Sequence, residues 1–296
     1  MIHYHQCPVC GTENINKVFT AKDYTVSQQL FDILECTSCS LRFTNNIPGE
    51  KEMGAYYQSE NYISHSNTRK GFINRLYHVI RNITLQSKKN ILLHYTKKPV
   101  GNLLDIGSGT GLFLKKMKDA GWNVTGLEPD ADARKISADQ QSGSVYLPEK
   151  LFELPLHSFD AISLWHVLEH VHNLHTYMEQ IKKLITPGGY LFVAVPNYTS
   201  ADAAYYKEHW AAYDVPRHLY HFSPKSMQHL FEKHGFVLKK TLPMWFDSFY
   251  VSMLSEKYRN EKNNYFNAIL RGSFSNLRAL GDNKNCSSVI YVAALA

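Results

Sequence analysis

The stretch VGNLLDIGSGTGLFLKKMKDAGW, residues 100–122, decides the fold. Leu103, Leu104 and Ile106 are typical of a short buried parallel strand, and three glycines follow at alternate positions. Residues 112–120 then have the pattern of a helix that ends at Gly121. A second strand is predicted over 124–127, with Glu128 at its end. Strand, glycine turn, helix, strand and acidic residue, in this order, predict a nucleotide-binding βαβ unit.

The aspartate before the glycines narrows the choice of nucleotide. Dinucleotide-binding folds typically carry G-x-G-x-x-G, whereas this chain has D-x-G-x-G-x-G over residues 105–111. A carboxylate at position 105 would repel a pyrophosphate, but it would suit an ammonium group such as the amino-acid end of S-adenosylmethionine. The pattern resembles that of the class I S-adenosylmethionine-dependent methyltransferases.

Later stretches agree with this resemblance in order and spacing. SFDAISLWHVLEHV (158–171) resembles the fourth strand of that family and the helix after it. LITPGGYLFVAVPN (184–197) resembles the turn into the fifth strand, and SSVIYVAALA (287–296) the last strand. The resemblance implies an α/β fold over about residues 99–296, with a doubly wound, seven-stranded, mostly parallel, Rossmann-like sheet.

The same resemblance implies which residues bind the cofactor. Asp105 and the glycines would line the methionine end, Glu128 would bind the ribose, and Pro129 would lie near the adenine. Trp165 either flanks the cofactor or is a core aromatic residue. The expected cofactor-binding residues are Asp105, Gly107, Ser108, Gly109, Gly111, Glu128, Pro129 and Trp165.

Four of the five cysteines come as two C-x-x-C pairs, Cys7/Cys10 and Cys36/Cys39. Pairs with this spacing suit tetrahedral zinc, and a segment this short benefits from a metal that stabilises it. A redox dithiol or buried unlinked thiols are the alternatives, but no βαβ pattern surrounds the pairs. Four thiolates would close the coordination sphere, so we expect a structural zinc.

The stretch WHVLEH, residues 165–170, contains His-x-x-Glu-His, a spacing found in one class of zinc proteases. If the stretch is helical, His166 and His170 share one face. The stretch follows a predicted strand of a doubly wound sheet, where ligands bind, and this context argues against a protease. In many related methyltransferases a Glu-His pair here only begins a helix, which is the structural alternative.

A second segment, HWAAYDVPRHLYHFSP (209–224), adds His218 and Arg217. Glu169-His170 with a later His218 resembles the ubiquinone-biosynthesis O-methyltransferases and the RNA 3′-terminal 2′-O-methyltransferases, which hold a divalent ion. His166 stands where the RNA enzymes have a glutamate, and imidazoles favour zinc, iron, nickel or copper over magnesium. A neutral histidine could instead act as a general base. Arg217 either clamps an anionic acceptor or pairs with Asp214. The catalytic candidates are His166, Glu169, His170, His218 and Arg217.

The composition is that of a globular protein, with 296 residues, 44% hydrophobic residues and a formal net charge of +6. The N-terminus lacks the apolar core of a signal peptide and no apolar run is long enough to span a bilayer, so we expect a cytoplasmic protein. No acidic residue occurs from Asn61 to Leu104, where Arg69, Lys70 and further basic residues accompany a helical apolar spacing. That pattern indicates either a packed helix with a basic face or a helix that binds anionic lipid or nucleic acid.

We therefore expect a zinc-ribbon-like module over residues 1–50, a basic helical linker over 51–98 and a methyltransferase domain over 99–296, with lid insertions near 196–224 and 247–285. The leading function is methyl transfer to a hydroxyl or carbon of a small molecule such as a sugar or a quinone. An RNA methyltransferase with a metal-assisted His/Glu site and an inactive zinc-containing interaction protein are the alternatives. The sequence does not indicate the oligomeric state.

Overall fold

The computed structural model describes residues 1–57, 72–140, 142–262 and 264–296. Within them, a seven-stranded sheet has the order β10-β11-β8-β7-β4-β5-β6. Neighbouring strands from β8 to β6 run parallel, while β11 is antiparallel to both β8 and β10. The strands are β4 (Asn102–Ile106), β5 (Asn123–Leu127), β6 (Ser144–Tyr146), β7 (Phe159–Trp165), β8 (Ile185–Pro196), β10 (Phe236–Pro243) and β11 (Ser288–Leu295). This topology confirms the predicted fold class.

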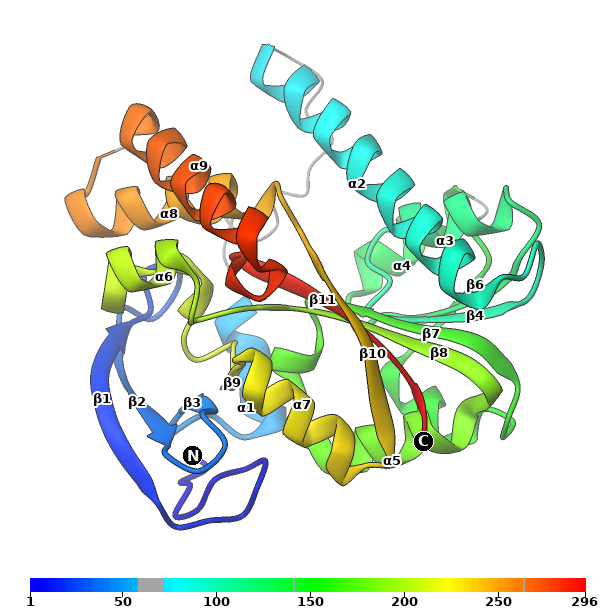
Figure 1. Ribbon diagram of the computed structural model, residues 1–296, viewed down its shortest axis with the longest axis horizontal. Coiled ribbons are helices and arrows are strands. Elements are labelled where there is room, and N and C mark those ends of the chain that lie inside the picture. Colours follow the sequence, from blue (N-terminus) through cyan, green and yellow to red (C-terminus); the bar gives the residue numbers. More distant parts are fainter. Residues whose placement is uncertain (58–71, 141, 263) are drawn as a thin grey trace.

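Helices cover both faces of the sheet (Figure 1). Successive side chains of a strand point to opposite faces, so Leu191 and Val193 of β8 pack in one core cluster and Phe192 in the other. The first cluster includes residues of α5 (Leu174–Leu184) and α7 (Pro224–Lys233). The second includes residues of α2 (Phe72–Thr96) and α3 (Leu112–Lys118). The helix α4 (Ala131–Asp139) lies between β5 and β6 in the chain.

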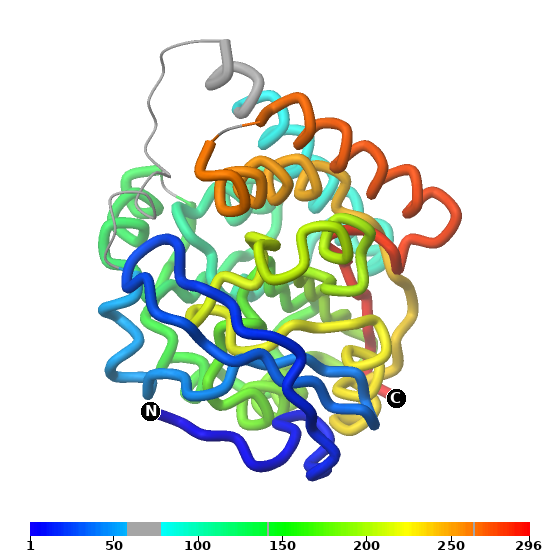
Figure 2. The backbone as a smooth tube through the Cα atoms, turned by 90° about the vertical axis from the view of Figure 1, so that its left-hand side faces the viewer, coloured from blue at the N-terminus to red at the C-terminus, as the bar shows by residue number. Residues whose placement is uncertain are grey.

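The N-terminal residues form a second sheet with the order β1-β2-β3-β9. Three of its strands are β1 (Ile15–Lys22), β2 (Leu30–Cys36) and β3 (Arg42–Thr44), followed by the short helix α1 (Glu50–Met53). The fourth, β9 (Tyr220–His221), comes from the segment after β8, and Phe43 pairs with Tyr220. Figure 2 shows this sheet lying across one side of the molecule. The N-terminal module is therefore joined to the larger domain by shared sheet hydrogen bonds.

The remaining helices follow β8 and β10. Residues 201–213 form α6 (Ala201–Tyr206) and two short 3₁₀ turns. Residues 247–262 and 264–285 contain α8 (Asp247–Asn260), α9 (Tyr265–Gly281) and a further 3₁₀ turn. In Figure 1 α8 and α9 lie beyond the carboxyl end of β8. The beginning of the basic segment, with Arg69 and Lys70, lies outside the described residues, and α2 forms the part from Phe72 onward. No helix in the described ranges is long and apolar enough to cross a membrane.

Candidate functional site

The glycine turn after β4 holds its shape through backbone hydrogen bonds to β5. The amides of Gly107 and Ser108 both donate to the carbonyl of Leu127, at 2.7 and 3.0 Å. Gly107, Gly109 and Gly111 all have positive φ, a conformation that side chains disfavour. The turn therefore needs glycine at all three positions, independently of any ligand.

The space around each glycine shows which of the three positions are filled by packing and which one leaves room for a ligand. A Cβ at Gly107 would lie 2.3 Å from Val167 Cγ2, and a Cβ at Gly111 would lie 2.1 Å from Ser137 Oγ. A Cβ at Gly109 would meet no atom within 4 Å. Gly107 and Gly111 thus serve packing, while Gly109 borders open space where a ligand can approach the backbone.

Asp105 is the buried acid at the floor of this turn. Its side chain is 1% exposed and accepts a hydrogen bond of 2.6 Å from Ser163 on β7. Burial raises the pKa of Asp105 to about 7, although the Ser163 hydroxyl and the nearby Lys88 ammonium oppose the shift. Burial disfavours the ionised form of this carboxyl group. A cationic ligand would restore the ionised form, so the site is suited to bind a cation.

Glu128 closes the other side of the turn. Its Oε2 accepts from the Gly109 amide at 2.7 Å, and its Oε1 accepts from the Asp130 amide at 3.0 Å. Asp130 caps α4, and Pro129 between the two acids is exposed. Burial raises the pKa of Glu128. The carboxylate thus lies beside the open space at Gly109, as hydrogen bonding to a ribose would require.

Lys88 of α2 lies close enough to Asp105 to affect its pKa, and sequence reasoning did not place it there. Its Nζ lies 4.5 Å from the centroid of the Trp165 ring. Burial lowers the pKa of Lys88, while the carboxylates of Asp105 and Asp247 oppose that shift. Trp165 also makes an edge contact with Phe113. One face of Trp165 therefore already holds a cation, and the ring also packs in the core.

The stretch WHVLEH is not an α-helix, so the expectation that His166 and His170 share a helical face is wrong. His166 has φ +59°, and only residues 168–170 form a 3₁₀ turn. The chain turns sharply here because the amide of His166 bonds to Ala194 on β8, while Val167 packs against Gly107. As a result, the side chains of His166 and His170 contact different residues.

Glu169, His170 and His218 form one group whose potential ligand atoms all lie within 4.8 Å of one another. His170 Nδ1 is 3.0 Å from the Arg217 carbonyl, and His218 Nδ1 is 2.8 Å from the Ala212 carbonyl. A carbonyl can only accept, so each Nδ1 is the donor, which leaves Nε2 as the nitrogen that could bind a metal. Backbone contacts of this kind orient metal-binding histidines.

Glu169 completes the group with a carboxylate that is 0% exposed. Among the described residues its oxygens accept no hydrogen bond of good geometry, and its contact is the ion pair with His166. Burial opposes its ionisation, but contact with His166 lowers the pKa of Glu169. Burial and the neighbouring His218 lower the pKa of His170 to about 4, so it is neutral at physiological pH. Two imidazoles and one carboxylate fit a divalent ion with an open coordination position.

His166 lies beside this group but outside it. Its Nδ1 is 3.3 Å from Glu169 Oε1, and its Nε2 is 2.9 Å from Asp247 Oδ2 at the start of α8. Burial opposes its charge, but the carboxylates of Asp247 and Glu169 outweigh burial and raise the pKa of His166 to about 10. The charged ring links the two carboxylates. Nothing in the sequence indicated Asp247, which lies far along the chain.

Arg217 is enclosed rather than directed at open space. It is 1% exposed, pairs with Asp214, and lies 3.1 Å from the buried Asp23 of the N-terminal module. It also donates to the carbonyl of Tyr56 at 2.9 Å. These contacts favour the structural ion pair over an acceptor clamp.

The N-terminal module supports the segment that carries His218. Thr44 Oγ1 donates to the His218 carbonyl at 2.7 Å, and the Thr44 amide donates to the Leu219 carbonyl at 2.9 Å. The hydroxyl of Tyr57 lies 3.0 Å from His170 Nδ1. Residues before position 58 thus contact two of the three candidate ligands or their backbone.

The four paired cysteines converge within the module. Cys7 Sγ lies 3.5 Å from Cys39 Sγ, and Cys10 Sγ lies 3.5 Å from Cys36 Sγ. Tetrahedral zinc with thiolate bonds of 2.3 Å separates its sulfur ligands by about 3.8 Å. None of the four forms a disulfide, and all ligand atoms lie within 4.8 Å. The group could hold zinc, and Cys286 is buried elsewhere.

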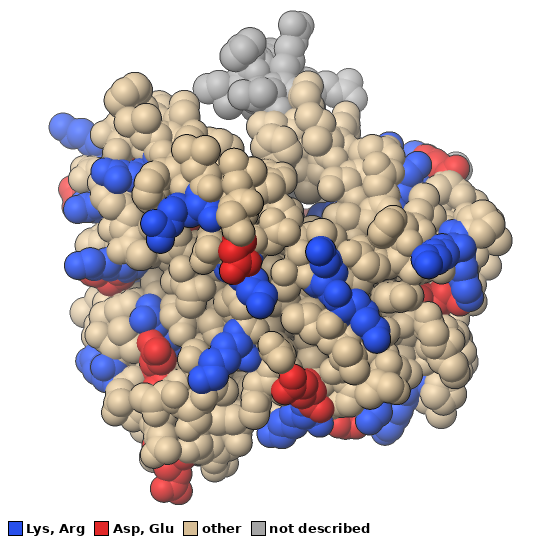
Figure 3. All heavy atoms as spheres, viewed as in Figure 1, with Lys and Arg blue, Asp and Glu red and all other residues tan. Residues whose placement is uncertain are grey.

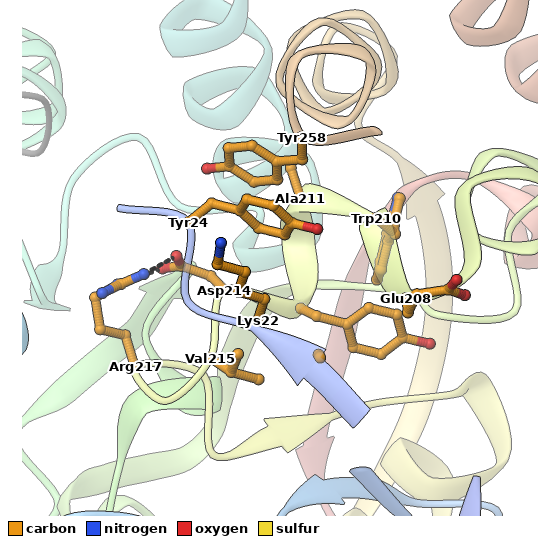
Figure 4. Close-up of a pocket in the computed structure, with 11 residues that line it drawn as sticks. Lys22, Tyr24, Glu208, Trp210, Ala211, Asp214, Val215, Arg217 and Tyr258 are labelled. Carbon is orange, nitrogen blue, oxygen red and sulfur yellow. Dashed lines mark hydrogen bonds and ion pairs between the residues drawn. The ribbon is translucent and has the colours of Figure 1, made fainter. Parts of the chain in front are cut away.

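A hollow at the seam of module and lid is shown in Figure 4. Tyr24 and Tyr258 stack over it with ring centroids 4.4 Å apart, and Trp210 lines it. Asp214 and Arg217 face one another at its edge, joined by the dashed contact. None of the expected cofactor-binding residues lines this hollow.

Comparisons with known proteins agree with this geometry. A family model described as a methyltransferase domain matches residues 75–241, more than half of the chain. The ubiquinone biosynthesis O-methyltransferase of Maricaulis maris is 34% identical over 105 residues, which are 33% of this chain and 41% of that protein. The human mitochondrial ubiquinone biosynthesis O-methyltransferase is 26% identical over 180 residues, 54% of this chain and 48% of that protein. The chain thus spans less than half the length of these curated relatives.

Solved structures agree on the fold. Haemonchus contortus phosphoethanolamine N-methyltransferase 2, solved with S-adenosyl-L-methionine, matches with a TM-score of 0.50 and 16% identity. The match covers 71% of this chain and 52% of that one. On the family match, the sheet topology and the glycine turn together, this chain belongs to the methyltransferase domain family.

Proposed function

We propose that the protein transfers a methyl group from S-adenosylmethionine to a hydroxyl group of a small molecule. The observation that carries the proposal is the placement of two sites on one sheet. Asp105, Gly109 and Glu128 surround open space after β4 and β5, and the Glu169–His170–His218 group follows β7. Ligands of doubly wound folds bind at the carboxyl ends of the strands.

On this proposal the chain binds and orients rather than supplying a covalent intermediate. Asp105 would hold the ammonium group of the cofactor, and Glu128 its ribose hydroxyls. The sulfonium is already activated, so alignment of the attacking oxygen with the methyl carbon provides most of the rate. Trp165, whose face holds Lys88 in this structure, would face the cofactor's positive charge once Lys88 moves aside.

Glu169, His170 and His218 would hold a divalent ion beside this position. Such an ion, when bound, polarises a coordinated hydroxyl and lowers its pKa. Asp247 and His166 would fix the orientation of Glu169. A donor set of two imidazoles and one carboxylate suits zinc or a related transition metal better than magnesium. We also propose that Cys7, Cys10, Cys36 and Cys39 hold a structural zinc.

The acceptor class follows from the same cluster. Two adjacent hydroxyls can chelate one ion, so we propose a catechol-like ring as the acceptor. The relatives named ubiquinone biosynthesis O-methyltransferases support a quinone-related compound. We further propose the division into a module over 1–50, a helical linker over 51–98, and a domain over 99–296 with lids near 196–224 and 247–285.

The test is transfer of radiolabelled methyl from S-adenosylmethionine to 3,4-dihydroxybenzoate, with 4-hydroxybenzoate as the matched monohydroxyl compound. We expect label in the catechol and little in the monophenol. Both acceptors are tested with wild type and with Glu169→Gln, which keeps the size of the side chain. Equal labelling of both compounds, or a catechol activity that Glu169→Gln leaves intact, would contradict the role of the cluster.

A further inference from the structure

Helix α9 (Tyr265–Gly281) turns its large apolar side chains outward. Six residues of it are between 50% and 76% exposed: Phe266, Ile269, Leu270, Phe274, Leu277 and Leu280. With about 100° between successive residues of a helix, these positions fall on one face. We call this set the α9 face. Within the described part of the chain, nothing buries it.

The opposite side of α9 is lined by small residues. Ala268, Gly272, Ser275 and Ala279 are buried at helical spacing. A Cβ on Gly272 would lie 2.8 Å from Phe249, so α8 and α9 pack closely there. A surface helix normally buries its large apolar residues and exposes polar ones. Among the described residues this packing is complete with small residues, which leaves the large ones available for a contact outside this part of the chain.

The charges around the α9 face are mostly basic. Exposed cationic side chains on α8, α9 and their flanking turns are Lys257, Arg259, Lys262, Arg278 and Lys284. The exposed acids there are Glu261 and Asp282, since Glu256 is buried and Asp247 pairs with His166. In Figure 3 the surface over α8 and α9, at the upper left, is mostly uncharged and bordered by Lys and Arg.

We infer that the α9 face docks the protein on an anionic lipid bilayer. An apolar helix face with basic residues beside it can lie in the headgroup region with its axis parallel to the membrane. A second copy of the chain would bring the same excess of positive charge to the contact, whereas anionic headgroups neutralise it. The helix lies along the outer edge of the molecule, where it can reach a flat surface (Figure 2).

The position of α9 next to α8 would place the candidate site near the bilayer surface. α8, which packs on α9, begins at Asp247, and Asp247 contacts His166 beside the Glu169 group. An acceptor dissolved in the membrane would therefore approach from the side of the lid. The docking itself does not depend on methyl transfer, and a failure of the proposed reaction would leave it intact.

Co-sedimentation with vesicles tests the inference. Wild type should sediment with phosphatidylcholine vesicles that contain about 30% phosphatidylglycerol, and far less with phosphatidylcholine alone. Salt at about 0.5 M should weaken the binding, because it screens the electrostatic part. The double variant Phe274→Ser, Leu277→Ser should bind at least about tenfold more weakly, since it removes apolar area from the interface.

The matched control is Leu156→Ser, Val237→Ser, which changes two apolar residues that are 60% and 42% exposed and lie outside α8 and α9. It should bind vesicles as wild type does, and circular dichroism should show that both variants are folded. Wild type that stays in the supernatant with anionic vesicles would overturn the inference. So would a dimer in analytical ultracentrifugation that the α9 variant dissociates while vesicle binding is unchanged, because the face would then belong to a second copy.

Discussion

The glycine-turn pocket and the Glu169–His170–His218 group follow strands of the same sheet, but the chain builds them differently. The pocket comes almost entirely from residues 105–128, a continuous stretch with one turn, one helix and two strands. The second group draws on residues 166–170, on 212–221, on Asp247 and on the N-terminal module. A site made from one stretch depends on local conformation, whereas the second depends on how distant segments are joined.

Disrupting the cysteine group should produce the largest difference between the two sites, because only the second site depends on the N-terminal module. For Cys36→Ser we expect a loss of stability on the order of 5 kcal/mol or more, because structural zinc contributes folding free energy directly. Loss of the module would release β9 and the backbone of His218, so divalent-ion binding at the second site should disappear. The glycine-turn pocket should still bind S-adenosylhomocysteine. Thermal melts measure the stability, metal analysis the bound ion and calorimetry the cofactor binding. Loss of cofactor binding together with ion binding would show that the two sites are not independent.

Glu169→Gln should break the second site alone. Removing the one carboxylate of the group should lower methyl transfer by at least about a hundredfold, because an ion contributes several kcal/mol to the transition state. Cofactor affinity should stay within about threefold of wild type, since Glu169 lies outside the glycine turn. Absorption spectroscopy with cobalt measures ion binding, and calorimetry measures cofactor affinity. Glu149→Gln, which changes an exposed acid of the segment 148–153, is the control.

Thr44→Val sharpens the comparison, because it removes one hydroxyl that lies outside both sites. Thr44 donates to the His218 carbonyl, and its loss should loosen the histidine. We expect ion affinity to fall by about ten- to a hundredfold, the usual cost of losing a contact that orients a ligand. Thr20→Val removes a comparable hydroxyl bond, to Asp32 in the same module, and should leave ion affinity unchanged. Equal effects of the two substitutions would show only general destabilisation.

The smallest effect concerns pH. Burial raises the pKa of Asp105 to about 7 in the free protein, and a cationic ligand favours the ionised form. Affinity for S-adenosylhomocysteine should therefore rise with pH and level off above about 7, with a five- to tenfold difference between pH about 6 and 8. Asp105→Asn, which should lose the binding, should show no such rise between the two pH values. A flat wild-type profile from calorimetry would show that Asp105 does not contact the ammonium group.

The comparison also explains what could be predicted from the sequence. The central sheet follows from short apolar runs and the glycine turn, signals that lie within one stretch of chain. The pairing of β3 with β9 could not be predicted, because β9 has two residues and no pattern of its own. The left-handed backbone of His166 was also hidden, since a tertiary contact between Val167 and Gly107 imposes it. Lys88, Asp247 and Tyr57 were missed because only the fold brings them to the sites.

The central claim is that the glycine turn holds S-adenosylmethionine, and calorimetric titration with S-adenosylhomocysteine tests it most directly. We predict micromolar binding by wild type at pH about 8 and by Asp132→Asn, which changes an exposed acid on α4. Asp105→Asn should stay folded, because it replaces a buried carboxylate with a neutral group of the same size, and should lose the binding. No binding by folded wild type, or equal binding by Asp105→Asn, would contradict the claim.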